Sequence, residues 1–364
     1  IAEVLIFDSV LEQDELERVE ASLANKYGIT AWSPYYGLIS HFDFDQTSGT
    51  NLPDISENGY DGTLMNMSGN EWVEGVKGNA LQFDGVDDYV DLPDGYDDFT
   101  QGLTISAWVK HDSVKGWARY MSMGNGENSD NIWTGTYLSS NALGYSVRQG
   151  TEEEYLFSPS VEAFPLNEWN HITVEHDLVD GGTARIIVNG FYMTYKSVHI
   201  PNEILRTNNY IARSNWLADE FFHGTIDDLR IYNRGIAHNE VQQLVTMGDY
   251  QFWDNDANDG LASSANNWLY NRLPDDNDVI VFDRHDTVVT WDAGNAYKAM
   301  ELRAPFFTGQ VNINDPLTLT SHFKQQTDTS ISIYLDSVNA AEYGSITAPT
   351  ITGPTASPIL APTP

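Results

Sequence analysis

The sequence predicts an all-β protein whose central region is an antiparallel β-sandwich. Between Tyr36 and Tyr232, short segments alternate apolar and polar residues, as strands with one buried face do. Clusters of Gly, Asn and Asp separate these segments, as expected of turns. Asn189-Gly190 follows one segment directly, and this dipeptide tolerates the positive φ angles of a tight hairpin turn. Many antiparallel strands with polar outer faces form a sandwich or a barrel.

The segment from Leu103 to Val109 shows the strand pattern most clearly. Its odd-numbered residues are apolar and should share one face, while Thr104, Ser106 and Trp108 should share the other. The pattern therefore predicts a strand with one buried face. Further predicted strands cover residues 37–42, 80–83, 169–174 and 184–188.

Residues 249–345 predict a separate, smaller β-rich module. The predicted strands, 278–282, 287–291, 310–313 and 317–320, are short and closely spaced. This spacing suits either a small sandwich or the first coils of a β-solenoid. Residues 346–364 alternate Thr, Ala and Ser with prolines, which indicates an extended linker and, we expect, further modules after it.

Residues 1–30 resemble a later part of the chain. The segment Ile1–Asp8 matches Ile226–Asn233 in order and residue class, and a short acidic helix pattern follows both copies. The later copy should close the domain of residues 31–248, so the earlier one should close a domain upstream. We therefore expect a piece of a longer protein. An independent strand and helix at residues 1–30 is the alternative.

The charge of the chain restricts its partners. The formal net charge is -35, from 53 acidic and 18 basic residues. Such a surface repels nucleic acids and anionic lipid headgroups, and no apolar segment is long enough to enter a membrane. It attracts divalent cations such as Ca²⁺, although a purely solvating role explains the charge as well. The absence of cysteine excludes disulfides, thiolate chemistry and cysteine-ligated zinc.

Five segments of the central region together carry a family resemblance. In order they are residues 78–90, 104–110, 167–174, 188–190 and 224–234, and residues 41–45 and 58–64 fit the same pattern. They resemble the laminin-G-like jelly roll of the concanavalin-A-like lectin/glucanase superfamily. The resemblance implies a concanavalin-A-like antiparallel β-sandwich at residues 31–248. Residues 250–282 resemble, more distantly, the entry of β-rich modules in large bacterial surface proteins.

The resemblance also implies one structural Ca²⁺ ion. Its ligands would be the carboxylate of Asp227 in the closing strand, Asp43 or Asp45 after the opening strand, and the carbonyl of Gly78. The ion would then tie the first and last strands together. The alternative is that Asp227 and its neighbour simply flank a solvent-facing strand. The acidic turn at residues 254–260 departs from a calcium-loop motif and is better explained as a turn.

Four aromatic residues are candidates for ligand contact. Carbohydrate is the usual ligand class of the resembled family, and sugar rings stack on aromatic side chains. Trp117, Trp133, Tyr137 and Trp216 lie in stretches rich in Gly, Asn and Ser, which predict loops. Ordinary packing of large aromatic side chains is the alternative interpretation.

Catalysis has little support in the sequence. Glycosidases of the resembled superfamily carry acidic residues at alternate positions of one strand, and no such spacing occurs in a predicted strand here. The contiguous triplet Glu152–Glu154 places neighbouring side chains on opposite faces. No serine-hydrolase, nucleotide-binding or zinc-protease motif is present. We therefore predict a protein that is not an enzyme.

These observations lead to three functional hypotheses. The first is an extracellular, calcium-stabilised surface or matrix module that binds a glycan or a neighbouring protein, as in adhesion. The second is a structural subunit of a fibre or layer that self-assembles through the apolar strand at residues 1–7, because unpaired edge strands recruit other chains. The third is an accessory module of a polysaccharide-degrading enzyme.

Overall fold

The structure is a computed structural model that describes residues 36–352, except residues 57, 160–164, 179–181, 248–249, 254, 256, 270–271, 277, 283–287, 292–295, 303–309, 314–316, 326–329, 334–345 and 348–349. The predictions for residues 1–30 therefore lie outside the described residues. The chain divides into two compact units, residues 1–241 and 242–364.

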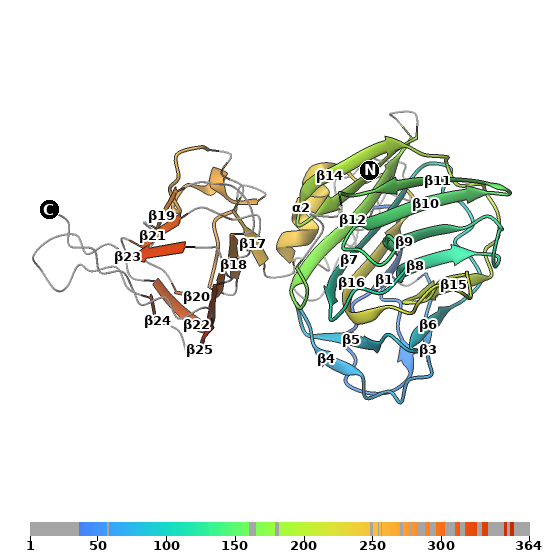
Figure 1. Cartoon of the computed structure of the whole chain (residues 1–364), viewed down its shortest axis with the longest axis horizontal. Helices are drawn as coiled ribbons and strands as arrows, with labels where there is room; N and C mark the ends of the chain where they lie inside the picture. The colour runs from blue at the N-terminus through green and yellow to red at the C-terminus, as the bar shows by residue number, and fades with distance from the viewer. Residues whose placement is uncertain are drawn as a thin grey trace, which may run out of the picture. The chain divides into compact units, whose positions relative to one another are not determined.

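The first unit is a sandwich of two antiparallel sheets that face each other (Figure 1). The first sheet has the order β14-β13-β12-β7-β16-β5-β4, with β1 also paired to β16. Its strands are β1 (Leu38–Phe42), β4 (Trp72–Glu74), β5 (Asn79–Asp84), β7 (Leu103–His111), β12 (Trp169–Asp177), β13 (Thr183–Val188), β14 (Phe191–Ser197) and β16 (His223–Tyr232).

The second sheet has the order β11-β10-β9-β8-β15-β6-β3-β2. Its strands are β2 (Asn51–Leu52), β3 (Gly62–Met65), β6 (Tyr89–Leu92), β8 (Arg119–Gly124), β9 (Ile132–Thr136), β10 (Leu143–Gln149), β11 (Glu152–Phe157) and β15 (Asn208–Ile211). The predicted all-β, concanavalin-A-like antiparallel sandwich is confirmed.

The alternation in β7 places its apolar residues in the core. Leu103, Ile105, Ala107 and Val109 belong to one buried cluster between the sheets, as the sequence predicts, but Thr104, Ser106 and Trp108 on the opposite face are buried as well, so the strand does not have a single buried face. The predicted hairpin is also present, because Asn189 and Gly190 have φ angles of 53° and 80° and join β13 to β14. Local sequence therefore determines both the strand face and the turn.

Strand β16 closes the sandwich. It pairs with β7, β5 and β1, so the last strand of the unit lies between strands from its beginning and middle. Helix α2 (His238–Met247) follows, and Glu240 in its first turn forms an ion pair with Arg234 at 2.5 Å. No described helix has both the length and the apolar character needed to span a membrane.

The second unit contains parallel strands, which is the pairing found in β-solenoids. One sheet has the order β17-β18-β20-β22-β24, with β25 also paired to β22, and the other has the order β19-β21-β23. Residues 346–347 and 350–352 of the predicted linker form two of these strands, consistent with the high strand propensity of Thr and Ile. The strands are β17 (Tyr250–Phe252), β18 (Val279–Phe282), β19 (Val288–Trp291), β20 (Ala296–Leu302), β21 (Gln310–Ile313), β22 (Leu317–Gln325), β23 (Ser330–Ile333), β24 (Ile346–Thr347) and β25 (Thr350–Thr352), and the 3₁₀ helix η1 is Ala265–Asn267.

The acidic turn at the start of this unit makes internal hydrogen bonds. Asp259 accepts hydrogen bonds from the backbone of Leu261 at 2.9 Å and from the side chain of Asn267 at 2.5 Å. Asn255 and Asn258 have positive φ angles, which asparagine tolerates better than most residues. These contacts agree with the interpretation of this stretch as a turn.

Candidate ligand-binding face and metal site

A row of side chains crosses the outer face of the second sheet. The strand registers align Tyr210, Ser122, Trp133, Ser146 and Tyr155 on five neighbouring strands, β15 to β11. Residues adjacent to them in sequence point into the core of the sandwich, so strand alternation directs this row away from it. The row brings two tyrosines and a tryptophan together with small polar residues.

Arg119 lies at the centre of an aromatic cluster on this face. Its guanidinium carbon is 3.7 Å from the centroid of the Trp133 ring and 5.4 and 5.9 Å from those of Trp117 and Trp216. The side chain is 3% exposed and forms an ion pair with Asp219 at 2.8 Å. Burial lowers the pKa of Arg119 to about 10. We call Trp117, Arg119, Trp133, Tyr137 and Trp216 the Arg119 cluster.

Trp133 is held from several sides. Its indole N–H donates to Glu153 at 3.2 Å, and Ser146 donates to the same carboxylate oxygen at 2.8 Å. Burial tends to raise the pKa of Glu153, but hydrogen bonds from Tyr155, Ser146 and Trp133 lower it below its usual value. Beneath the indole is Gly144, where an added Cβ would come within 2.8 Å of the ring. The ring therefore has little freedom to move.

Trp117 and Tyr137 are partly exposed and come from loops at the ends of strands. The two rings make an edge-to-face contact at 5.1 Å, and Tyr137 stacks on Phe157 at 3.7 Å. Trp117 has a φ angle of 57°, which costs a residue other than glycine roughly 1–2 kcal/mol. Non-glycine residues in such conformations cluster at ligand sites.

The loop of residues 212–221 positions Trp216. Ser214 donates to Asp219 at 2.6 Å and accepts a hydrogen bond from the backbone of Trp216 at 3.1 Å. Asn215 donates to Ser122 at 2.9 Å, which fixes the loop over the sheet face. Trp216 therefore lies partly exposed beside the Arg119 guanidinium.

The structure brings all four predicted aromatic residues together, with one correction. Trp133 lies in strand β9, not in a loop, and is 1% exposed. The glycines that suggested a loop are required by close packing, because a Cβ at Gly135 would lie 2.0 Å from the carbonyl oxygen of Ala118. Trp133 thus packs against Arg119 and against the partly exposed ring of Trp117. Sequence reasoning missed Arg119, whose place depends on strand register.

The predicted metal ligand Asp227 lies in the closing strand and is 1% exposed. Its Oδ2 atom accepts a hydrogen bond from the backbone of Val76 at 2.8 Å, while Oδ1 has no hydrogen-bond partner among the described residues. Burial, together with the charge of Asp228, raises the pKa of Asp227 to about 8. A buried carboxylate oxygen without a partner suits a cation ligand.

The turn between β4 and β5 brings the other predicted ligands to this region. Asp45 Oδ1 accepts a hydrogen bond from the backbone of Asn79 at 2.7 Å, and a Cβ on Gly78 would lie 1.8 Å from the same oxygen. Asp43 accepts a 3.2 Å hydrogen bond from the backbone of Asp45. Carboxylate and carbonyl oxygens are the donors that Ca²⁺ prefers, but Asp43, Asp45 and Asp227 do not bring three carboxylate oxygens within 4.8 Å of one another in the structure.

The next residue of β16 makes a second buried contact that the sequence did not reveal. Asp228, with φ of 46°, bonds to His41 at 2.6 Å and to Arg230 at 3.0 Å. Burial raises its pKa, but the charges of Arg230 and His41 outweigh this and hold it well below the usual range. The register shift between Asp227 and Arg230 allows the neighbouring aspartates Asp227 and Asp228 to contact different groups.

A family model covers most of the sandwich. Residues 84–242 match the model described as the concanavalin A-like lectin/glucanases superfamily. The β-sandwich therefore has the concanavalin A-like fold, and we call it the concanavalin A-like domain. Curated protein sequences give no significant match.

Several solved structures resemble the concanavalin A-like domain at low sequence identity. Domain 4 of a GH43 extracellular arabinanase from Geobacillus stearothermophilus, in complex with arabinotriose, has a TM-score of 0.45 and 19% identity, over 57% of this chain and 98% of that one. The binding domain of Paraclostridial Mosquitocidal Protein 1 has a TM-score of 0.44 and 14% identity, over 60% and 53%. A Trypanosoma rangeli sialidase in complex with sialic acid has a TM-score of 0.43 and 16% identity, over 58% and 33%.

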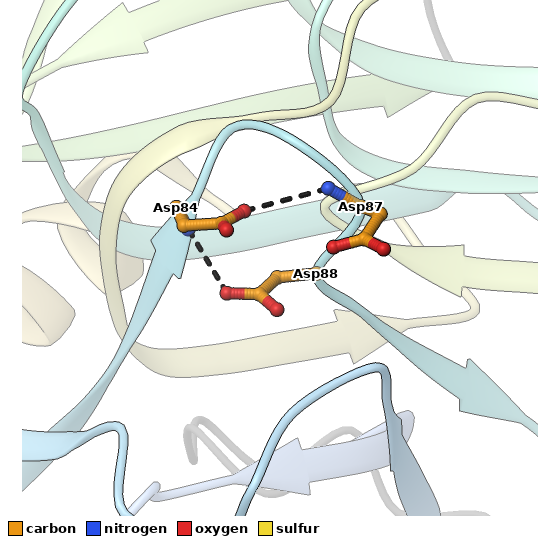
Figure 2. A group of neighbouring side chains, drawn as sticks. All are labelled: Asp84, Asp87 and Asp88. Atoms are coloured by element: carbon orange, nitrogen blue, oxygen red, sulfur yellow. Dashed lines mark hydrogen bonds between the residues drawn. The ribbon is translucent and has the colours of Figure 1, made fainter.

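A second acidic group of the concanavalin A-like domain lies in the turn between β5 and β6 (Figure 2). Ligand oxygens of Asp84, Asp87 and Asp88 all lie within 4.8 Å of one another. Asp84 accepts hydrogen bonds from the backbone of Val86 and Asp87, and Asp88 accepts one from the backbone of Asp84. Burial and neighbouring carboxylates raise the pKa of Asp88 to about 6. These backbone hydrogen bonds are typical of a turn, and they account for the proximity of the three carboxylates.

The concanavalin A-like domain also brings a serine and a histidine together. Ser113 Oγ lies 2.7 Å from His223 Nδ1, but His223 Nε2 is 3.9 Å from Asp112. A catalytic triad needs hydrogen-bond contact, about 2.6–3.2 Å, at both steps. The distance to Asp112 is too long, so these residues do not complete a triad.

Proposed function

We propose that the concanavalin A-like domain binds a polysaccharide on the outer face of its second sheet. The observation that carries the proposal is the convergence of Trp117 and Trp216, two partly exposed rings from separate loops, around one buried arginine, with the partly exposed ring of Tyr137 against Trp117. The apolar C–H faces of sugars stack on aromatic rings. Rings fixed before binding also lose little conformational entropy on contact.

Substitution of the exposed rings tests the proposal. The double variant Trp117→Ala and Trp216→Ala should lose at least about tenfold in affinity for the best ligand of a polysaccharide panel, because each ring supplies over 1 kcal/mol of contact. The matched control is Tyr195→Ala, which removes a ring that is 75% exposed on strand β14 of the other sheet. Titration calorimetry with the whole chain measures both. Equal loss in the two variants would refute the assignment of the site.

We further propose that this domain binds without cleaving its ligand. The long separation of His223 from Asp112 and the backbone hydrogen bonds of Asp84 support this proposal. Incubation of bound polysaccharide with the whole chain should release no new reducing ends. Release that disappears in the variant Ser113→Ala or Asp88→Asn would contradict it.

We also propose a structural Ca²⁺ ion at the seam between β1 and β16. Asp227 would supply the buried carboxylate, and Asp45, Gly78 and Asp43 would complete the oxygen donors. The unpartnered Oδ1 of Asp227 supports the site. The ion would offset a buried negative charge and join the first strand, the 75–79 turn and the closing strand.

Thermal melting with and without a chelator tests the ion. Wild type should melt several degrees higher with calcium, since a ligand bound only to the folded state stabilises it by RT ln(1 + [L]/Kd). Asp227→Asn should abolish this increase, while Asp87→Asn, in the other acidic group, should preserve it. A calcium effect that survives Asp227→Asn but not Asp87→Asn would move the site to the β5–β6 turn.

The setting that we propose is the cell surface or matrix, where such a module would adhere to a glycan or to a neighbouring protein. The absence of cysteine and the strong negative charge are compatible with that setting. Labelling of intact cells with a membrane-impermeant reagent would test it. Labelling only after lysis would contradict it.

A further inference from the structure

A second arginine on the same sheet face is placed differently from Arg119. The guanidinium carbon of Arg213 lies 4.5 Å from the ring centroid of Tyr89 and 4.6 Å from that of Tyr210. The two rings meet edge to face at 5.7 Å, and Phe221 lies 6.3 Å from Tyr89. We call Tyr89, Tyr210, Arg213 and Phe221 the Arg213 cluster. None of its members was predicted from the sequence as a site residue.

The backbone directs Arg213 onto this face. Strand alternation would send Tyr210 outward, Ile211 inward and Arg213 inward again. Ala212 interrupts the alternation with a φ angle of 67°, and it is held there by backbone hydrogen bonds to Tyr120 at 3.2 Å and from Phe222 at 3.1 Å. Left-handed geometry is costly for alanine and is found at ligand sites when surrounding bonds maintain it.

The Arg213 guanidinium also keeps its hydrogen-bonding capacity. It is partly exposed and, within the described part of the chain, takes part in no hydrogen bond or ion pair. Asp91 is the register partner of Tyr210, and partial desolvation raises its pKa above the usual value although the charge of Arg213 acts in the opposite direction. Five N–H donors thus lie beside two aromatic rings on a chain of net charge -35.

We propose that Arg213 binds an oxyanion group, carboxylate or sulfate, of an acidic sugar residue. This inference rests on the polysaccharide-binding function proposed above and names the class of its ligand. The planar guanidinium forms paired hydrogen bonds with such groups, and the flanking tyrosines offer stacking surface to the sugar ring. Asp91 can accept hydrogen bonds from sugar hydroxyls.

The loop of residues 212–221 connects the Arg213 cluster to the Arg119 cluster. It supplies Arg213 and Phe221 to one cluster and Trp216 to the other. Along the register row, Tyr210 and Trp133 are separated only by Ser122 of strand β8, which places them about 9–10 Å apart at the usual strand spacing. One oligosaccharide can therefore contact both clusters.

Paired polymers test the ligand class. Polygalacturonate, alginate and hyaluronate are each compared with their carboxyl-reduced, neutral forms, and dextran sulfate is compared with dextran. Binding to the whole chain is measured at 150 mM salt, which limits the Debye length to about 8 Å and screens the net charge. The protein variants are wild type, Arg213→Gln, Arg213→Lys and the control Tyr195→Ala.

Wild type should bind the acidic member of at least one pair about tenfold more tightly, and Arg213→Gln should abolish that preference within the pair. Arg213→Lys should retain part of it. The carboxylated and sulfated pairs distinguish the two oxyanions. Equal or better binding of the neutral member in every pair overturns the inference but leaves polysaccharide binding intact. Failure to bind any polymer overturns both.

Discussion

Two arginines on one sheet face both lie against aromatic rings but differ in accessibility. Arg119 is 3% exposed, paired with Asp219, and enclosed by three indoles. Arg213 is partly exposed, lies on two tyrosines, and has no ion pair within the described residues. A buried cation can only organise the groups around it, whereas an accessible one can also bind a ligand.

The comparison distinguishes an arginine that positions other side chains from an arginine that can bind a ligand itself. The Nε and Nη1 atoms of Arg119 are buried and have no hydrogen-bond partner among the residues that the structure describes, so a ligand cannot reach them while the cluster is intact. In the proposed function, Arg119 would contribute to binding only by fixing the orientation of Trp117 and Trp216. Arg213 needs no such rearrangement, because its side chain is already accessible.

The largest expected effect comes from removal of the buried cation. Arg119→Gln leaves Asp219 without its ion-pair partner, and breaking a buried pair costs about 3–5 kcal/mol. Arg213→Gln breaks no ion pair and should cost less than about 1 kcal/mol. Urea unfolding of both variants measures the difference in the free energy of unfolding. Similar costs for the two substitutions would break the distinction drawn between the clusters.

Gly144→Ala should have an intermediate effect. The new Cβ would lie 2.8 Å from the Trp133 ring, and overpacking of this kind costs about 1–3 kcal/mol. The double-mutant cycle with Trp133→Phe is the matched control, because a smaller ring leaves room for the methyl group. Unfolding and tryptophan fluorescence report the result. An alanine that costs the same with Trp133 and with Phe at this position would show that the ring is not held against Gly144.

The fold could be predicted because its signals are local. The alternation in residues 103–109 identifies the face of β7 that lies between the sheets, and Asn189-Gly190 identifies the hairpin after β13. The sequence could not distinguish parallel strand pairing in the second unit from an antiparallel sandwich. Its strands have similar local patterns in both arrangements, and only the pairing of segments such as β18 with β20 distinguishes them.

The site could be predicted only in part, because some of its residues have local sequence signals and others depend on strand pairing and backbone geometry. Trp117, Tyr137 and Trp216 stand out as large rings in turn-rich sequence, so composition alone identifies them. Arg119 and Arg213 do not stand out, since one depends on strand register and the other on the left-handed backbone of Ala212. The calcium ligands came from family resemblance and stay a prediction; the structure shows that Asp227 is buried.

The smallest expected effect is the pH dependence of the Arg119→Gln penalty. Burial raises the pKa of Asp219, and the charge of Arg119 partly lowers it again. Without Arg119 the folded-state pKa of Asp219 should rise further above its unfolded value of about 3.9. A raised carboxyl pKa costs no stability below the unfolded value, and the cost grows as pH rises through the folded value. The variant should therefore lie closer to wild type at pH 4.5 than at pH 7.5 in urea unfolding. Arg213→Gln is the control and should show almost the same small difference at both pH values. A constant Arg119→Gln penalty across this range would show that lost packing against the indoles, not the unpaired carboxylate of Asp219, accounts for the instability.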